Sequence, residues 1–172
     1  MNHLTGLNPE FLERVDAVLA KVRSEGFEMK PFYGLRSPFE QAKLWRQSRT
    51  WNEIEMKMEE LKRAGGHRIA ACIGYVGPCS GSKVTNATPG MSWHQYGEAV
   101  DCFAVDHYGR ADWNSNSMAY KSYVKAARLL GLRAGADFDD IVHIQLKQKE
   151  PHQVYSIVEI EKILAEKWPS FA

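Results

Sequence analysis

Apolar residues near the start of the chain recur every three or four positions, which is the spacing of one face of a helix. Asn8 is a suitable N-cap, Pro9 suits the first helical position, and Gly26 ends the pattern. A helix that buries one face in a core is therefore predicted between Pro9 and Gly26. The residues on that face are Phe11, Leu12, Val15, Val18, Leu19 and Val22.

Three more helices are predicted where a Ser or Thr is followed three residues later by Glu, the signature of a capping box. They start at Ser37, Thr50 and Ser156. The helix from Thr50 ends at Gly65 and has a second face of Glu, Lys and Arg, which is typical of a solvated amphipathic helix. Residues 117–130 form a further helix by their apolar spacing.

Three segments are predicted to be strands. Residues 27–35 contain Pro31, which cannot donate to a neighbouring strand, so an edge position is expected. Residues 98–105 and 142–146 are rich in β-branched and other apolar residues. Residues 65–91 are rich in Gly, Pro, Ser, Thr and Asn, which predicts a long surface loop with one short strand at 83–87.

These elements predict an α+β fold in which a small, mostly antiparallel sheet has helices packed on one side. The length of 172 residues predicts one domain spanning residues 1–172, with a helix and loop inserted at about 50–91. No repeat or linker marks a second domain. Three cysteines cannot all pair, and Cys72, Cys79 and Cys102 are expected to be reduced thiols.

The formal charges nearly cancel, because the chain has 22 Lys and Arg residues and 21 Asp and Glu residues. The net charge is too small to produce an electrostatic field that would attract nucleic acid or a membrane surface, so neither partner is expected. No secretory leader and no apolar run long enough to span a membrane is evident, which predicts a cytoplasmic protein without membrane insertion. We expect a monomer.

Two short segments contain the candidate metal ligands and the candidate general base. Residues 92–101 include His94 and Asp101, and residues 140–143 include Asp140 and His143. A catalytic zinc site has three nitrogen or oxygen ligands and one open position for water, which His94, Asp101 and His143 would supply. Asp140 would then be the general base that takes the proton of the water. Such ligands also suit manganese, iron, cobalt or nickel.

The spacings constrain the local structure of this site. His94 and Asp101 are seven residues apart. In a strand, this odd separation would place the two side chains on opposite faces, and in a helix they would lie about 10 Å apart along the axis, so neither element would bring both to one ion. His94 is therefore expected on a turn that Gly97 permits, with Asp101 in the strand that follows. Asp140 suits a loop that enters the strand of His143. The predicted metal lies between two strands.

The pattern Ser-x-His-x-x-Gly-x-Ala-x-Asp at residues 92–101, with Asp-x-x-His at 140–143, resembles that of the LAS zinc metallopeptidases. Residues 34–41 are similar to the Gly-x-Arg-Ser-x-x-x-Gln segment of the same family. This family includes phage L-alanyl-D-glutamate endolysins and D-alanyl-D-alanine carboxypeptidases. The resemblance implies one zinc ion held by His94, Asp101 and His143, with Asp140 as the catalytic acid and base. It implies Arg36 as a cation beside the substrate.

The resemblance favours one branch of the family. The carboxypeptidase branch typically has Glu-x-Trp-His at the second motif, whereas this chain has Asp140-Ile141-Val142-His143. We therefore expect a phage endolysin that cleaves the L-alanyl-D-glutamate bond of the peptidoglycan stem peptide after release from the producing cell. The alternatives are a D-alanyl-D-alanine carboxypeptidase or dipeptidase, and a non-catalytic wall-binding protein of the same fold. No separate wall-binding domain is expected.

Four other residues near these motifs have two interpretations each. Arg36 either contacts the substrate or pairs with a carboxylate such as Glu40. Ser92 either caps a turn or contacts the substrate. Tyr96 either forms a substrate wall or packs against neighbours. Gln41 either braces the site or contacts the substrate, and bracing is favoured.

Overall fold

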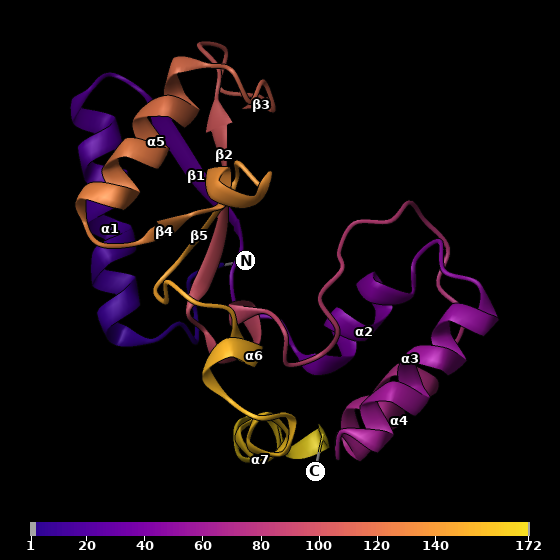
Figure 1. Cartoon of the computed structure of the whole chain (residues 1–172). Coiled ribbons are helices and arrows are strands. Elements are labelled where there is room, and N and C mark those ends of the chain that lie inside the picture. Colours follow the sequence, from indigo (N-terminus) through magenta and orange to yellow (C-terminus); the bar gives the residue numbers. More distant parts are fainter. Residues whose placement is uncertain (1–2, 172) are drawn as a thin grey trace. The chain divides into compact units, whose positions relative to one another are not determined.

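The computed structural model describes residues 3–171 (Figure 1). The chain divides into two compact units, each built from separate stretches of sequence. Unit 1 comprises Met1–Leu35 and Gly97–Gln148, and unit 2 comprises Arg36–Tyr96 and Lys149–Ala172. The interpretation of 1–172 as one domain stays a prediction.

Unit 1 contains the whole sheet. Its strands are β1 (Glu28–Tyr33), β2 (Ala99–Val105), β3 (Ala111–Asp112), β4 (Arg133–Ala134) and β5 (His143–Gln145). The order is β1-β2-β5-β4, with β3 also paired to β2, and every pairing is antiparallel. The expected α+β class and antiparallel sheet are confirmed. Pro31 lies in β1 at one end of this order, as its missing N–H requires.

Two helices of unit 1 pack against the sheet. The helices α1 (Pro9–Ser24) and α5 (Met118–Leu129) contact each other and β1 (Figure 1). Asn8 caps α1 by accepting from the backbone N–H groups of Glu10 and Phe11, as its position before Pro9 predicts. The shared core is apolar and includes fully buried Phe11, Val15, Val18, Val22, Val100, Cys102, Tyr120, Tyr123 and Ile144.

Unit 2 is helical. It contains α2 (Pro38–Arg46), α3 (Trp51–Arg63), α4 (His67–Tyr75), α6 (Pro151–Val154) and α7 (Ile157–Lys167), with 3-10 turns η1 (Trp93–Tyr96) and η3 (Pro169–Phe171). The three predicted capping boxes are confirmed at the starts of α2, α3 and α7. The core of unit 2 includes buried Ala42, Trp45, Ile54, Leu61, Ile69, Ile73, Ile160, Leu164 and Phe171.

The prediction of a continuous loop over residues 65–91 is wrong in its first part. Helix α4 spans His67–Tyr75, and residues 83–87 form no strand. The two glycines before α4 indicated a loop, but Gly66 is the N-cap of the helix. A helix of this length is marginal by itself and is stabilised by burying its apolar face against α2 and α3. That face contains Ile69, Ala70, Cys72 and Ile73.

The three cysteines are free, as expected from their number. Burial raises the pKa values of the Cys72 and Cys102 thiols to about 12, which keeps both protonated at neutral pH. Within residues 3–171, no helix has both the length and the apolar character needed to cross a bilayer.

The capping box of α7 gives a direct test of local stability. Replacing Ser156 with Ala removes the acceptor of the Glu159 N–H and should lower the free energy of unfolding by about 1 kcal/mol. Urea unfolding of Ser156→Ala measures this change, with Ser82→Ala in an exposed loop as the control. Equal midpoints for the two variants would contradict the assigned cap.

Candidate functional site

Strand pairing in unit 1 places Asp101 directly opposite His143. The register of β2 and β5 pairs Ala99 with Gln145, Val100 with Ile144 and Asp101 with His143. The Oδ1 atom of Asp101 lies 3.0 Å from Nδ1 of His143, and both side chains are buried. Side chains of directly opposed residues project from the same face of a sheet. The expected position of these two residues on neighbouring strands is confirmed.

The other ring nitrogen of His143 is held by Gln145. Nε2 lies 3.1 Å from Oε1 of Gln145, two residues along the same strand and therefore on the same face. The amide nitrogen of Gln145 donates to the Lys147 carbonyl at 2.7 Å, which leaves the amide oxygen toward the ring. With this orientation of the amide, Nε2 of His143 donates to Gln145, and Nδ1 faces Asp101 with a lone pair in the neutral ring or with a proton in the imidazolium.

When the His143 ring is neutral, this arrangement brings two acceptors to a separation of 3.0 Å, because neither the Asp101 carboxylate nor Nδ1 then has a hydrogen to donate. A proton or a metal ion between them removes the repulsion. Two donors at the usual zinc distances of a tetrahedral site lie roughly 3.3 Å apart, close to the observed separation. The pair therefore fits a cation with nitrogen and oxygen ligands.

The pKa of His143 reflects the same preference for positive charge. Burial alone lowers it, but the hydrogen bond and charge of Asp101, the charge of Asp140 and the hydrogen bond of Gln145 together raise the pKa above its ordinary value. The carboxylates of this unit therefore stabilise a cation at the ring.

Asp140 lies in the loop before β5 and is exposed. The loop is fixed by two backbone hydrogen bonds, from Asp140 N to the Gly135 carbonyl at 2.9 Å and from His143 N to the Asp140 carbonyl at 3.0 Å. A side chain at Gly135 would place Cβ 1.8 Å from the Asp140 carbonyl oxygen, so only glycine permits this approach. The predicted loop that enters the His143 strand is confirmed.

The remaining predicted residues belong to unit 2. His94 lies in η1, and its carbonyl accepts from the Arg36 N–H at 3.2 Å. Gly97, directly after η1, has φ of +73°, and a Cβ there would lie 2.7 Å from the Gly6 carbonyl oxygen. The expected turn at His94, followed by a strand that contains Asp101, is confirmed.

The Glu40 carboxylate takes part in the capping box of α2. It accepts from the Ser37 N–H and hydroxyl, both at 2.8 Å. The guanidinium of Arg36 donates to Oε1 of Gln41 at 2.9 Å. Gln41 is fully buried and also accepts from Gln95 at 3.1 Å, while its own amide group donates to a loop carbonyl at 2.7 Å. Gln41 therefore braces Arg36 against η1.

Ser92 and Tyr96 make local contacts at the two ends of η1. The Ser92 hydroxyl accepts from the His94 N–H at 3.5 Å, and the Ser92 carbonyl accepts from the Gln95 N–H at 3.1 Å, so Ser92 caps the turn. The Tyr96 hydroxyl donates to the Gly90 carbonyl at 2.9 Å, and its ring stacks with Tyr155 at a centroid distance of 6.3 Å. These contacts explain the positions of both side chains by packing, and substrate contacts of Ser92 and Tyr96 stay predictions.

No role for Gln145 was predicted from the sequence. The alternation of β5 was the available signal, since it puts residues 143 and 145 on one face. The contact of Gln95 with Gln41 had no signal in the sequence, because it joins residues 54 positions apart. Within residues 3–171, His94, Asp101 and His143 are the candidate metal ligands, and Asp101 and His143 are the two that unit 1 supplies.

Comparison with solved structures gives distant matches. A Serratia marcescens L-Ala D-Glu endopeptidase, ChiX, is 20% identical, with a TM-score of 0.47 over 85% of this chain and 84% of that chain. The vancomycin-resistance D,D-pentapeptidase VanY of a VanB-type cassette, described in complex with Zn(II), is 18% identical, with a TM-score of 0.47 over 92% and 78%. An L,D-carboxypeptidase, DacB, of Streptococcus pneumonia is 19% identical, with a TM-score of 0.44 over 96% and 74%.

Comparison with curated proteins gives no match. The model of one protein family, VanY, described as D-alanyl-D-alanine carboxypeptidase, matches residues 4–131. This stretch contains Arg36, His94 and Asp101 and includes most of the chain. The expected relationship to the zinc peptidases of peptidoglycan is therefore confirmed, and the chain belongs to the VanY family.

Proposed function

We propose that this protein is a zinc-dependent endopeptidase that hydrolyses the L-alanyl-D-glutamate bond of the peptidoglycan stem peptide. The observation that carries the proposal is the pair of buried acceptors, Asp101 and His143, with Asp140 three residues before the histidine. A cation site beside an exposed carboxylate is the arrangement needed for metal-assisted hydrolysis of an amide.

His94, Asp101 and His143 would hold the ion. Two imidazoles and one carboxylate leave the fourth position of a tetrahedral site for water, which is typical of catalytic and not of structural zinc. The orientation of His143 by Gln145 supports its assignment, because ligating histidines usually donate their second N–H to an oxygen acceptor. When bound, zinc supplies a Lewis acid for the scissile carbonyl and lowers the pKa of a water molecule.

Two side chains act on the substrate, one by transferring a proton and one by stabilising negative charge. Asp140 takes the proton of the attacking water and returns it to the leaving amine, as a general base and then a general acid. Arg36 stabilises the negative charge that develops on the carbonyl oxygen. Gln41 holds the guanidinium of Arg36 for this role. Ser92 and Tyr96 border the substrate at η1.

The endopeptidase reaction and a role as a phage endolysin are supported by Asp140 at the second motif, where the carboxypeptidase branch typically has Glu. The alternative is removal of terminal D-alanine, which the description of the matching family model favours. A non-catalytic wall-binding protein is a further alternative, but its sequence would have lost a ligand or Asp140, and all four residues are present.

The direct test is to incubate the zinc-loaded protein with peptidoglycan sacculi and to identify new amino termini by mass spectrometry. We expect amino-terminal D-glutamate, absent when a chelator is added. Release of free D-alanine would transfer the assignment to the carboxypeptidase reaction. Intact sacculi from several hosts, together with intact D-alanyl-D-alanine peptides, would contradict both reactions.

The role of Asp140 can be separated from metal binding. Asp140→Asn keeps the loop and the ligands but removes the base, so zinc content should be unchanged while kcat falls by about 100-fold or more. His143→Ala should lose both zinc and activity. Asp139→Asn is the matched control, because Asn tolerates the positive φ of 62° at that position. Wild-type kcat in Asp140→Asn would rule out the assigned base.

Gln145 should contribute to zinc affinity without contacting zinc. Gln145→Leu removes the acceptor of the His143 Nε2–H and should weaken zinc binding by roughly 10- to 100-fold. Competition with a chromogenic chelator measures the dissociation constant. Gln148→Leu, at an exposed position in the same unit, is the control. Equal affinities for the two variants would show that Gln145 does not orient the ring.

A further inference from the structure

Three aromatic side chains gather on one face of the sheet in unit 1. The centroid of the Phe32 ring lies 6.0 Å from that of Phe103 and 5.3 Å from that of Trp113. The Phe103 and Trp113 centroids lie 5.6 Å apart. Trp113 is 57% exposed, and both phenylalanines are partly exposed. Rings at these distances contact one another, so the three form one aromatic surface, here called the aromatic platform.

The aromatic platform lies on the face of the sheet from which the candidate metal ligands project. Val100, Cys102 and Ala104 of β2 belong to the apolar core. Asp101 and Phe103 alternate with them and therefore project from the opposite face. Phe103 of the platform is thus the next residue of β2 on the side of Asp101.

An irregularity in β1 brings a second strand to the same place. The register pairs Tyr33 with Asp101, and it shifts between Pro31 and Tyr33, which makes Phe32 an extra residue. Bulges of this kind re-aim side chains and are frequent beside active sites. The contact of the Phe32 and Phe103 rings shows that Phe32 faces the platform, one residue before the tyrosine that opposes Asp101.

The aromatic platform combines apolar surface with a hydrogen-bond donor and little charge. Lys30, which is opposite Phe103 in the register, pairs with Glu28 at 3.4 Å, so its charge is compensated. Within residues 3–171, the indole N–H of Trp113 donates to no protein group, whereas that of Trp93 donates to a carbonyl at 2.8 Å. A neutral ligand that has both C–H and hydroxyl groups matches this combination.

We propose that the aromatic platform binds the sugar ring to which the stem peptide is attached, while the scissile bond lies at Asp101 and His143. The inference rests on the proposed function and adds a glycan subsite to it. One face of a pyranose ring presents C–H groups, whose positive partial charge is attracted to the negative face of an aromatic ring. The N-acetylated sugar and the L-alanine next to it are uncharged, unlike D-glutamate, and so suit this surface.

The distances also favour this half of the substrate. One alanyl residue and one lactyl unit separate the scissile L-alanyl-D-glutamate bond from the sugar, and together they span at most about 7 Å, since each chain unit extends by about 3.5 Å. Two residues of β2 separate Asp101 from Phe103, which is also about 7 Å. The D-alanyl-D-alanine bond is three residues further from the sugar, so only the proposed bond brings the sugar to the platform.

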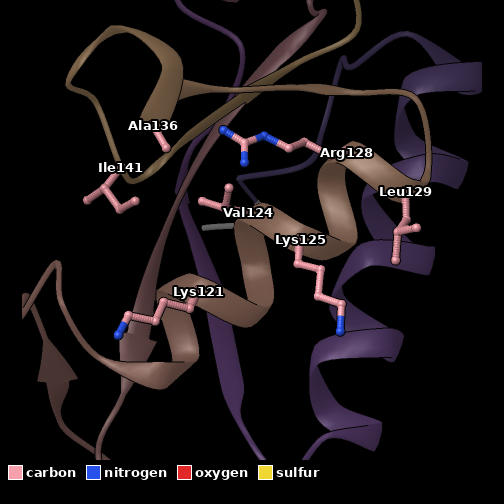
Figure 2. A pocket seen from close by; sticks show the side chains of 7 residues that line it. All are labelled: Lys121, Val124, Lys125, Arg128, Leu129, Ala136 and Ile141. Atoms are coloured by element: carbon pink, nitrogen blue, oxygen red, sulfur yellow. The ribbon is translucent and has the colours of Figure 1, made fainter.

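The groove beside α5 provides a control position. It has a volume of about 570 Å³ and lies on the other side of the sheet, because α5 packs against the core face (Figure 2). Its lining contains the exposed Leu129 and no residue of the candidate site or of the aromatic platform. Leu129→Ala therefore removes exposed apolar surface from unit 1 without changing the platform.

The test compares Trp113→Ala with the wild-type, zinc-loaded protein on two substrates. One is the stem pentapeptide attached to N-acetylmuramic acid, and the other is the same peptide with an acetyl group in place of the sugar. On the sugar-linked peptide, loss of the indole should lower kcat/KM by roughly threefold to tenfold, as expected for one lost aromatic contact. On the acetyl peptide, which has no sugar, the two proteins should have equal kcat/KM values.

Two further variants complete the comparison. Leu129→Ala should match the wild-type protein on both substrates, and Trp113→Phe, which keeps an aromatic face, should recover most of the lost kcat/KM. An unchanged kcat/KM of Trp113→Ala on the sugar-linked peptide would overturn the proposal. An equal fall on both substrates would also overturn it, because the indole would then support the fold or bind the peptide and not the sugar.

A binding measurement keeps this inference separate from the proposed reaction. If no protein cleaves either substrate, the proposed function fails, and calorimetric titration of the same proteins with both peptides then tests the aromatic platform alone. Tighter binding of the sugar-linked peptide than of the acetyl peptide, with the difference lost in Trp113→Ala, supports the platform. Equal binding of the two peptides by the wild-type protein, or no binding of either, would overturn it.

Discussion

The pairing of Asp101 with His143 across β2 and β5 is the constraint on which the proposed chemistry depends. A shift of one residue in this register would send one of the two side chains to the apolar core face. The register is specified by that core, since Val100, Cys102 and Ile144 must remain buried. Hydrophobic packing on one face of the sheet thus fixes polar geometry on the other.

Gln145 extends this arrangement without any additional element. Gln145 lies on the same strand face as His143, and its amide nitrogen donates to the Lys147 carbonyl. The three-residue strand β5 therefore contains both the imidazole ring and the amide that orients it. The backbone bonds at Gly135 and Asp140 then attach the exposed carboxylate to the same strand. Unit 1 therefore connects the His143 ring, the Asp101 carboxylate and Asp140, the proposed base, through adjacent backbone hydrogen bonds.

Local patterns in the sequence predicted most of the fold. The capping boxes, the Asn8 cap and the apolar composition of the β2 and β5 segments are features of a few neighbouring residues, so the sequence predicts them directly. Helix α4 was missed because its stability comes from packing and not from a local signal. A bracing role was expected for Gln41, but its contact with Gln95 was missed for a related reason, since it joins α2 to η1 across more than fifty residues.

The segment at residues 50–91, which the sequence predicts to be an insertion, packs against the last helix of the chain. The backbone N–H of Ile69 in α4 donates to the Glu161 carboxylate of α7 at 2.8 Å, and Ile160 and Leu164 of α7 share a core with Ile69. This segment therefore shares its core with α7 and is not a removable module. In evolution or in protein engineering, its gain or loss would have to be accompanied by a matching change in the last helix.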